Sequence, residues 1–141
     1  MAEGLLRHRV QQLGLKRVIR VDSAGTRASV PRHKPDTRAQ KVMACAGVSL
    51  AGIKARQVTV KDLIRSDYVL AMDSSNYNDL LAICPPEHQN KIKLLMSYAL
   101  QLGVNEVPDP YYGSAAGFEE VFRLVDVAVD QLLQAITRSM E

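Results

Sequence analysis

Two short runs along the chain are apolar at nearly every position rather than at every second one. They cover residues 18–21, interrupted by Arg20, and residues 68–72. Runs of this kind are typical of strands in a parallel sheet that helices cover on both faces. A third run, residues 92–96, is similar but contains Lys93. The pattern therefore predicts three buried strands.

Between these runs, apolar residues recur at spacings of three and four, which is typical of helices with one buried face. The pattern predicts helices over residues 2–13, 36–46, 77–84 and 117–138, and Asp36 can cap the second of them. A glycine follows each of the first two helices, and two prolines end the third. The predicted core-facing stripe of the last helix comprises Phe118, Phe122, Val125, Val129, Leu132 and Ile136.

Alternating strands and helices predict one α/β domain over residues 1–141, with a doubly wound parallel sheet. The order begins in an unusual way, because the first predicted element is a helix. A strand at residues 18–21 needs a parallel neighbour joined by a right-handed crossover. The helix over residues 2–13 would be that crossover without the strand before it. The given sequence is therefore expected to begin in the middle of a strand–helix–strand unit.

The composition narrows the classes of partner. The net charge of +3 favours an anionic ligand such as phosphate. Aromatic residues make up 5% of the chain and do not alternate with a basic patch, so no nucleic-acid partner is expected. No apolar run reaches the roughly 20 residues of a membrane span and no signal peptide is visible, which predicts a cytoplasmic protein without a membrane partner. Cys45 and Cys84 are expected to be reduced thiols that fill the core.

Polar residues follow two of the predicted strands. Residues 22–26, which include Ser23, come after the first strand, and residues 73–76, which include Asp73 and Asn76, come after the second. The carboxyl ends of parallel strands meet at one edge of a sheet, where ligands of such folds bind. In the alternative interpretation, Ser23 serves only the loop backbone and Asp73 caps the next helix.

The segment around Asp109 is the most informative one in the chain. Pro110 favours an extended conformation at Asp109, and two adjacent tyrosines, Tyr111 and Tyr112, are unusual in an exposed loop. A carboxyl group on a stiff loop in partly apolar surroundings can hold the proton that a leaving phenolate needs. The alternative is a simple turn with tyrosines on the surface.

Six short blocks of sequence occur in an order and spacing that is specific when taken together, although each block is a weak signal. The chain resembles the low-molecular-weight protein-tyrosine phosphatases, and the resemblance runs over essentially its whole length. The blocks are Ala2-Glu3-Gly4, Val21-Asp22-Ser23-Ala24-Gly25-Thr26, Pro35-Asp36-x-Arg38-Ala39, Ala55-Arg56-Gln57, Ala71-Met72-Asp73-x-x-Asn76 and Asp109-Pro110-Tyr111-Tyr112.

The resemblance implies a four-stranded parallel sheet flanked by helices, of which this chain would supply three strands. It implies hydrolysis of a phosphotyrosine-containing protein or a small aryl phosphate through a cysteinyl phosphate, with no metal and no cofactor. Asp109 would be the general acid, and Tyr111 and Tyr112 would line the mouth of the substrate pocket. The residues implied to support the phosphate-binding loop are Ser23, Asp73 and Asn76.

The family's C-x5-R loop, which carries the nucleophilic cysteine and the phosphate-binding arginine, has no counterpart among the 141 residues. Cys45 is followed six residues later by Ala51, and Cys84 by Asn90. The family's first strand, which is central in the sheet, and this loop would directly precede Met1. The chain is therefore expected to be an N-terminally truncated member that is inactive as it stands.

Three explanations stay open. The first is a coding sequence that starts at an internal methionine. The second is a degenerate relative that binds phosphate or a phosphoprotein without catalysis. Ser29 stands where many relatives have an aromatic residue, and Ile53 stands where some have a histidine. The third is an arsenate reductase on the same fold, which would need a further pair of redox cysteines.

Overall fold

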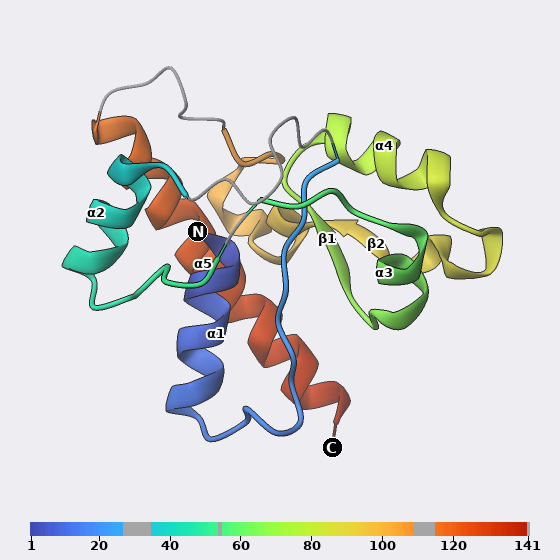
Figure 1. Cartoon of the computed structure of the whole chain (residues 1–141), viewed down its shortest axis with the longest axis horizontal. Helices are drawn as coiled ribbons and strands as arrows, with labels where there is room; N and C mark the ends of the chain where they lie inside the picture. Colours follow the sequence, from blue (N-terminus) through green and yellow to red (C-terminus); the bar gives the residue numbers. More distant parts are fainter. Residues whose placement is uncertain (27–34, 54, 109–114, 141) are drawn as a thin grey trace.

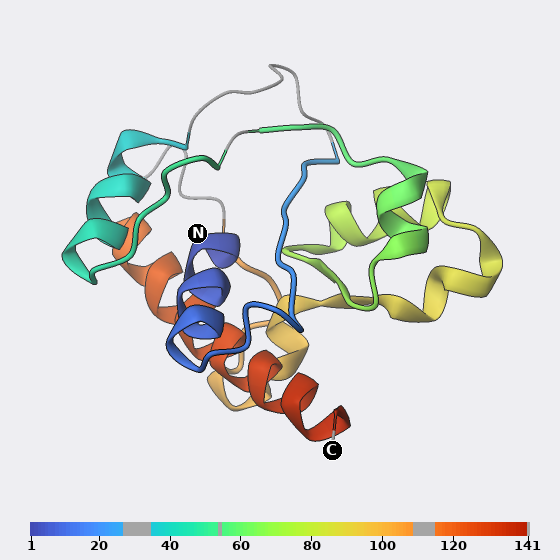
Figure 2. The ribbon, with the colours of Figure 1, turned by 60° about the horizontal axis from the view of Figure 1, so that its bottom comes forward.

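A computed structural model describes residues 1–26, 35–53, 55–108 and 115–140 of the chain. Helix α5 (Ala115–Ser139) crosses the molecule, and α1 (Ala2–Gln12) lies alongside it (Figures 1 and 2). The predicted apolar stripe of α5 is confirmed, because its residues are buried or partly buried in the main core. The helix therefore forms as its periodicity predicts, with one face covered by the rest of the chain.

Helix α2 (Thr37–Cys45) packs against the first half of α5. The carboxylate of Asp36 accepts a hydrogen bond from the backbone N–H of Arg38 at 2.8 Å, which confirms the predicted cap. The guanidinium of Arg38 lies 4.6 Å from the ring centre of Phe118 on α5. Gly47, just past the end of α2, has a φ of +75°, a conformation that glycine adopts without strain.

The sheet of the described residues has two strands, β1 (Val69–Ala71) and β2 (Ile92–Leu94), which pair in parallel. Helix α4 (Ser74–Ile83) begins directly after β1 and belongs to the crossover between the two strands. Helix α3 (Val60–Arg65) precedes β1 and was not predicted. Three of these four elements therefore lie where the pattern of apolar residues places them.

Short 3-10 helices complete the described chain. The first, η1 (Pro86–Lys91), leads into β2, and η2 (Leu95–Tyr98) and η3 (Leu100–Leu102) follow it. The predicted third strand, residues 92–96, is therefore shorter than expected. Leu95 is almost fully buried in η2, which packs against α5, so the chain turns into the main core as soon as β2 ends.

The side chains of β1 alternate between two cores. Leu70, and Met72 just after the strand, pack against the main core, which contains α1, α2 and α5. Val69 and Ala71 pack in a second core, which contains side chains of α3, α4 and β2. Both faces of β1 are therefore covered, which explains why its sequence is apolar at every position.

The predicted strand at residues 18–21 is not a strand in the structure. Val18 lies in a turn, and residues 19–24 follow an extended path between α1 and β1, but no described residue pairs with them in a ladder (Figure 1). Just beyond them, Gly25 forms an isolated parallel bridge with Gln57. A strand needs a hydrogen-bonded neighbour as well as an apolar sequence. Of the expected four-stranded sheet, the described residues form β1 and β2.

Two further expectations have different outcomes. Both cysteines are free thiols, and Cys84 is buried as predicted, but Cys45 lies exposed at the end of α2 and is not core filler. None of the described helices combines the length and the apolar character needed to cross a membrane. The 25 residues of α5 are instead amphipathic, with their apolar face in the main core.

Candidate active site

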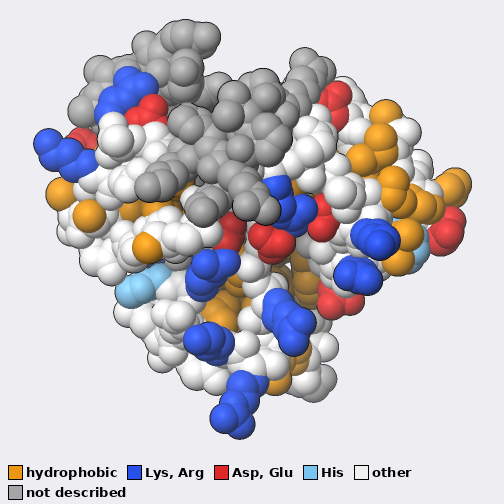
Figure 3. All heavy atoms as spheres, in the orientation of Figure 1, with side chains coloured by type: hydrophobic (Ala, Val, Ile, Leu, Met, Phe, Trp, Pro, Cys, Tyr) orange, Lys and Arg blue, Asp and Glu red, His pale blue; other side chains and the backbone are white. Residues whose placement is uncertain are grey.

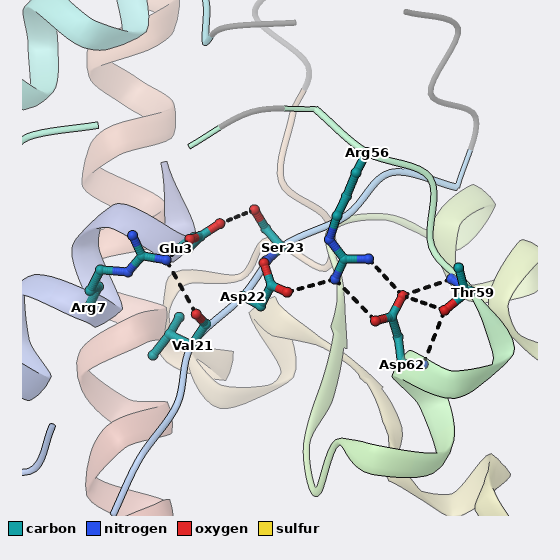
Figure 4. Close-up of polar contacts among 8 residues, drawn as sticks. All are labelled: Glu3, Arg7, Val21, Asp22, Ser23, Arg56, Thr59 and Asp62. Atoms are coloured by element: carbon teal, nitrogen blue, oxygen red, sulfur yellow. Dashed lines mark hydrogen bonds and ion pairs between the residues drawn. The ribbon is translucent and has the colours of Figure 1, made fainter. Parts of the chain in front are cut away.

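A buried acidic residue, Glu3, links the first turn of α1 to the extended segment. The Ser23 hydroxyl donates a hydrogen bond to its carboxylate, and Arg7, one turn along α1, forms an ion pair with it (Figure 4). Glu3 is 8% exposed. Arg7 also donates to the backbone carbonyl of Val21 at 3.4 Å. These contacts hold the carboxyl end of the extended segment beside the start of α1.

The start of α1 has no side-chain cap, since its N-cap residue is Met1. The first N–H groups of such a helix lack partners within the helix, and together with the helix dipole they favour an anion. Burial lowers the pKa of the Met1 amino group, while the charge of Glu3 acts in the opposite direction. Neither of these two groups favours an anion, so the attraction for a negatively charged ligand at this point comes from the helical N–H groups alone.

A second polar network joins the extended segment to α3. The Arg56 guanidinium donates to Asp22 at 2.8 Å and to Asp62 at 2.9 Å (Figure 4). Asp62 completes a capping box with Thr59 at the start of α3. The hydrogen bond from Arg56 lowers the pKa of Asp62, and the same bond raises the pKa of Arg56. Both groups are therefore charged at neutral pH, and Asp22 is held by the same guanidinium.

The start of α4 contributes the next part of the site. The Asn76 side chain donates to the Thr26 hydroxyl at 3.2 Å, which ties α4 to the end of the extended segment. The carboxylate of Asp73 accepts from the backbone N–H of Asn76 at 2.7 Å and caps α4. The interpretation of Asp73 as a helix cap is therefore confirmed.

A groove of about 790 Å³ lies between the extended segment and β1. Residues 18–26 form one rim and residues 66–72 form the other. Figure 3 shows a hollow with hydrophobic side chains inside it and charged side chains around its opening. Ser23 and Asn76 both line this groove. Asp73 does not line it, and its carboxylate caps the start of α4 instead. The structure thus brings two of the three predicted supporting residues to one cavity.

The predicted general acid Asp109 and the predicted substrate-binding residues Tyr111 and Tyr112 lie outside the described residues. The chain that leads to them is described. The backbone N–H of Val107 donates to the carbonyl of Met72 at 2.8 Å, directly after β1. Glu106 precedes Val107 in the chain, and its carboxylate accepts a hydrogen bond from the Ser74 hydroxyl at 2.6 Å. The approach to Asp109 is therefore fixed at the carboxyl end of β1.

Sequence reasoning assigned no role to three residues of this site: Glu3, Arg56 and Asp62. The spacing Thr59-x-x-Asp62 is the signature of a capping box and could have revealed both α3 and Asp62. Glu3 and Arg56 lie in two of the sequence blocks that carried the resemblance. Their partners, however, are far away in sequence, and only the fold brings them together.

Comparison with known proteins identifies the family. The family described as "Low molecular weight phosphotyrosine protein phosphatase" matches residues 1–141. The low molecular weight protein-tyrosine-phosphatase YfkJ of Bacillus subtilis is 34% identical over 141 residues, which are 100% of this chain and 89% of YfkJ. The human low molecular weight phosphotyrosine protein phosphatase is 36% identical over 129 residues, which cover 87% of this chain and 78% of the human protein.

Solved structures agree with this result. A protein tyrosine phosphatase from Entamoeba histolytica, crystallised with Hepes in the active site, superposes with a TM-score of 0.92 at 31% identity, over 99% of this chain and 89% of that chain. YfkJ also superposes with a TM-score of 0.92, over 99% of this chain and 87% of that chain. The chain belongs to the low-molecular-weight protein-tyrosine phosphatase family, a family of hydrolases that act on phosphotyrosine.

Proposed function

We propose that the carboxyl end of β1 is the site at which this chain contributes to phosphotyrosine hydrolysis. The observation that carries the proposal is the convergence of three segments there. Ser23 lies beside the uncapped start of α1, Asn76 is bonded to the end of the extended segment, and the stretch before Asp109 is bonded to Met72. An anion at this point would meet backbone N–H groups and a favourable helix dipole.

The proposed roles follow from the chemistry of a phosphate ester. Asp109 protonates the tyrosyl oxygen as it leaves, and then activates the water that hydrolyses the phosphoenzyme. Tyr111 and Tyr112 stack on the substrate ring at the mouth of the site. Ser23 and Asn76 support the loop that holds the phosphate. The substrate is a phosphotyrosine-containing protein or a small aryl phosphate, and the reaction needs no metal.

We further propose that residues 1–141 do not catalyse this reaction by themselves. The chain has no C-x5-R sequence, and neither cysteine is placed to replace the nucleophile. Cys45 is exposed on α2, and Cys84 is buried in the second core. Without a nucleophile, Asp109 has no leaving group to protonate. A protein that carries out the proposed reaction needs a strand and a C-x5-R loop in addition to residues 1–141.

The same lack of a nucleophile supports a second candidate, a relative that binds phosphate or phosphoprotein without turnover. Uncapped helical N–H groups and Ser23 would suffice for binding an anion, and no leaving group is needed for that function. No observation favours an arsenate reductase, since Cys45 and Cys84 are free and differ in exposure.

Turnover of p-nitrophenyl phosphate in the presence of EDTA separates these functions. We expect no turnover by residues 1–141, and turnover by a fusion that adds a strand and a C-x5-R loop ahead of Met1. The matched control is the same fusion with serine in place of the loop cysteine. A fusion that is folded and still inactive would contradict the phosphatase proposal. Binding of a phosphotyrosine peptide by residues 1–141 without hydrolysis would then support the binding protein.

A further inference from the structure

The positive charge of the chain is concentrated in one stretch of sequence. Residues 4–21 contain five Lys and Arg residues and no Asp or Glu, which gives this stretch a charge of +5. The remaining 13 of the 18 Lys and Arg residues are outnumbered by all 15 Asp and Glu residues, so the rest of the chain carries −2. The net charge of +3 therefore arises entirely from α1 and the segment that follows it.

Two of these five cations already have carboxylate partners. Arg7 forms an ion pair with Glu3, as described above. The Arg9 guanidinium lies 2.7 Å from the carboxylate of Asp126 and 3.1 Å from that of Asp130, both on α5. These pairs join α1 to its neighbours in the fold. The charge that the fold leaves unbalanced belongs to the other three cations.

Those three cations are Lys16, Arg17 and Arg20, and all of them are exposed. In the part of the chain that the structure describes, none of them forms an ion pair or a side-chain hydrogen bond. Lys16 and Arg17 are the central residues of a turn, which the backbone N–H of Val18 closes on the carbonyl of Leu15 at 3.0 Å. The turn fixes the backbone of neighbouring like charges, and an anion placed there would relieve their repulsion.

The end of α1 does not need these cations. Basic side chains after a helix often bond its last carbonyl groups. In α1, however, the backbone N–H of Gly14 donates to the carbonyl of Gln11 at 3.1 Å, and that of Leu15 donates to Val10 at 2.9 Å. Gly14 has a φ of +70°, so this is a Schellman motif that satisfies the carbonyl groups with backbone donors. The three charges are therefore available to an external ligand.

A hollow of about 540 Å³ lies between α1 and residues 16–21. Figure 3 shows Lys and Arg side chains gathered over α1 and the extended segment on this face. Residues 19–21 also line the groove described above, so the two cavities share one wall. The lining of the hollow combines basic and apolar side chains, which are Arg7, Lys16, Arg20, Val10, Ile19 and Val21.

We propose that this hollow binds an acidic segment of a partner protein, in which carboxylates flank one apolar residue. The apolar side chain enters the hollow against Val10 and Ile19. The carboxylates pair with Lys16, Arg17 and Arg20, and an arginine can hold a carboxylate through two parallel hydrogen bonds. The proposal concerns binding alone and does not rest on the proposed hydrolysis of phosphotyrosine.

An acidic peptide fits this surface better than the other polyanions that a basic surface could attract. Single-stranded nucleic acid is held by aromatic side chains as well as by cations, and residues 1–26 contain no aromatic residue. A helix that binds an anionic membrane inserts its apolar face into the bilayer. The apolar face of α1 is instead packed in the main core, where Leu5 is buried.

The test measures binding of a synthetic peptide to residues 1–141 by fluorescence anisotropy. The probe is the labelled peptide amide Gly-Glu-Asp-Leu-Glu-Asp-Gly, and the control peptide has Gln and Asn in place of Glu and Asp. We expect the probe to bind with one-to-one stoichiometry and the control to bind about tenfold more weakly or worse. Raising NaCl from about 50 to about 500 mM should weaken binding of the probe several-fold, because the charges are exposed. Equal affinity for the two peptides, or no binding of the probe, would overturn the proposal.

Two double variants with the same change in net charge show where the peptide binds. Lys16→Glu combined with Arg20→Glu reverses two charges of the hollow. Lys41→Glu combined with Lys61→Glu reverses two exposed charges on α2 and α3, outside it. We expect the first pair to weaken binding about tenfold or more, and the second pair to change it by less than about twofold. Equal losses would mean that the probe responds to overall charge, and the proposal would be wrong.

Two further measurements complete the test. Backbone NMR should show peptide-induced shifts at residues 7–20, and shifts confined to another surface would contradict the proposal. Circular dichroism confirms that each variant is folded. Competition identifies the class of partner: displacement of the probe by oligothymidylate or by phosphatidylserine vesicles at lower concentrations than the unlabelled peptide would assign the surface to nucleic acid or membrane and refute the proposal.

Discussion

The hydroxyl of Ser23 donates a hydrogen bond to the carboxylate of Glu3, 20 residues earlier in the chain. Glu3 is the buried polar residue of the described structure, and Arg7 is its second partner. Because burying a carboxylate is costly without such partners, this pair holds the extended segment at a defined position against α1. The end of that segment is also where the proposed phosphate site begins.

Replacing Glu3 with alanine should lower the free energy of unfolding by about 2 kcal/mol. Two hydrogen bonds to a charged, buried group are lost, and each contributes about 1.5 to 3 kcal/mol before relaxation. Urea unfolding followed by circular dichroism measures the change. The matched control is Glu119→Ala on the exposed side of α5, which should change stability by less than about 0.5 kcal/mol. Equal effects of the two substitutions would show that the Ser23 link does not stabilise the fold.

The cap that Asp73 provides for α4 leads to a prediction about the stability of the fold. Asp73→Ala should lower stability by about 1 kcal/mol, because the Asn76 backbone N–H loses its side-chain acceptor. Asp73→Ser, which can still accept that hydrogen bond, should retain most of the stability. Thermal melts of the two variants provide the comparison. If both variants melted at the same temperature as the unmodified chain, the cap would be dispensable.

Stability should fall in acid partly because of Asp62. Its folded-state pKa is lowered, chiefly by the hydrogen bond from Arg56. A lowered folded pKa means that the group stabilises the fold above its unfolded pKa, about 3.9 for aspartate, and that this contribution is lost as the pH falls through the folded value. We therefore expect the urea midpoint to be steady near neutral pH and to drop below about pH 4.

The contribution of Asp62 can be isolated with an amide. Asp62→Asn should be less stable than the unmodified chain at neutral pH, and the difference should shrink in acid, where Asp62 itself is protonated. Asp67→Asn, at an exposed position nearby, serves as the control and should preserve the full pH dependence. An unchanged pH profile in Asp62→Asn would show that other carboxylates account for the acid sensitivity.

The proposed role of Asp109 predicts a large kinetic effect in a protein that also carries a C-x5-R loop. Asp109→Asn keeps the size of the side chain but cannot donate the same proton, so kcat on aryl phosphates should fall by about 100-fold or more. Substrate binding should change little. The loss should be smaller for a substrate with a better leaving group, which needs less protonation. A decrease below about threefold would refute the assignment of Asp109 as the general acid.

The helices could be predicted because the information for them is local. The apolar spacing of α5, the Asp36 cap of α2 and the glycine after α2 all act within a few residues, and each was read correctly. Helix α3 was missed because six residues are too few for a clear periodicity. Its capping box was the signal that remained, and Thr59 and Asp62 carried it.

The sheet and the site could be predicted only in part, because they depend on partners that are distant in sequence. The run at residues 18–21 has the composition of a buried strand, yet a strand also needs a neighbour, and none of the described residues supplies one. Likewise, nothing local indicates that Arg56 would bridge Asp22 and Asp62, or that Glu3 would meet Ser23. Ser23 and Asn76 do line one groove, although residues 18–21 form no strand, and the binding of a ligand there stays a prediction.

The alternation of β1 between two cores has a mechanical consequence. Leu70 belongs to the core built on α5, and Ala71, the next residue, belongs to the core built on α3 and α4. The two halves of the molecule therefore share β1, and the hydrogen bond between Tyr68 and Ser139 also joins them. A polar side chain at position 70 would face the first core and one at position 71 would face the second, so substitutions at adjacent positions of β1 would disturb different halves of the molecule.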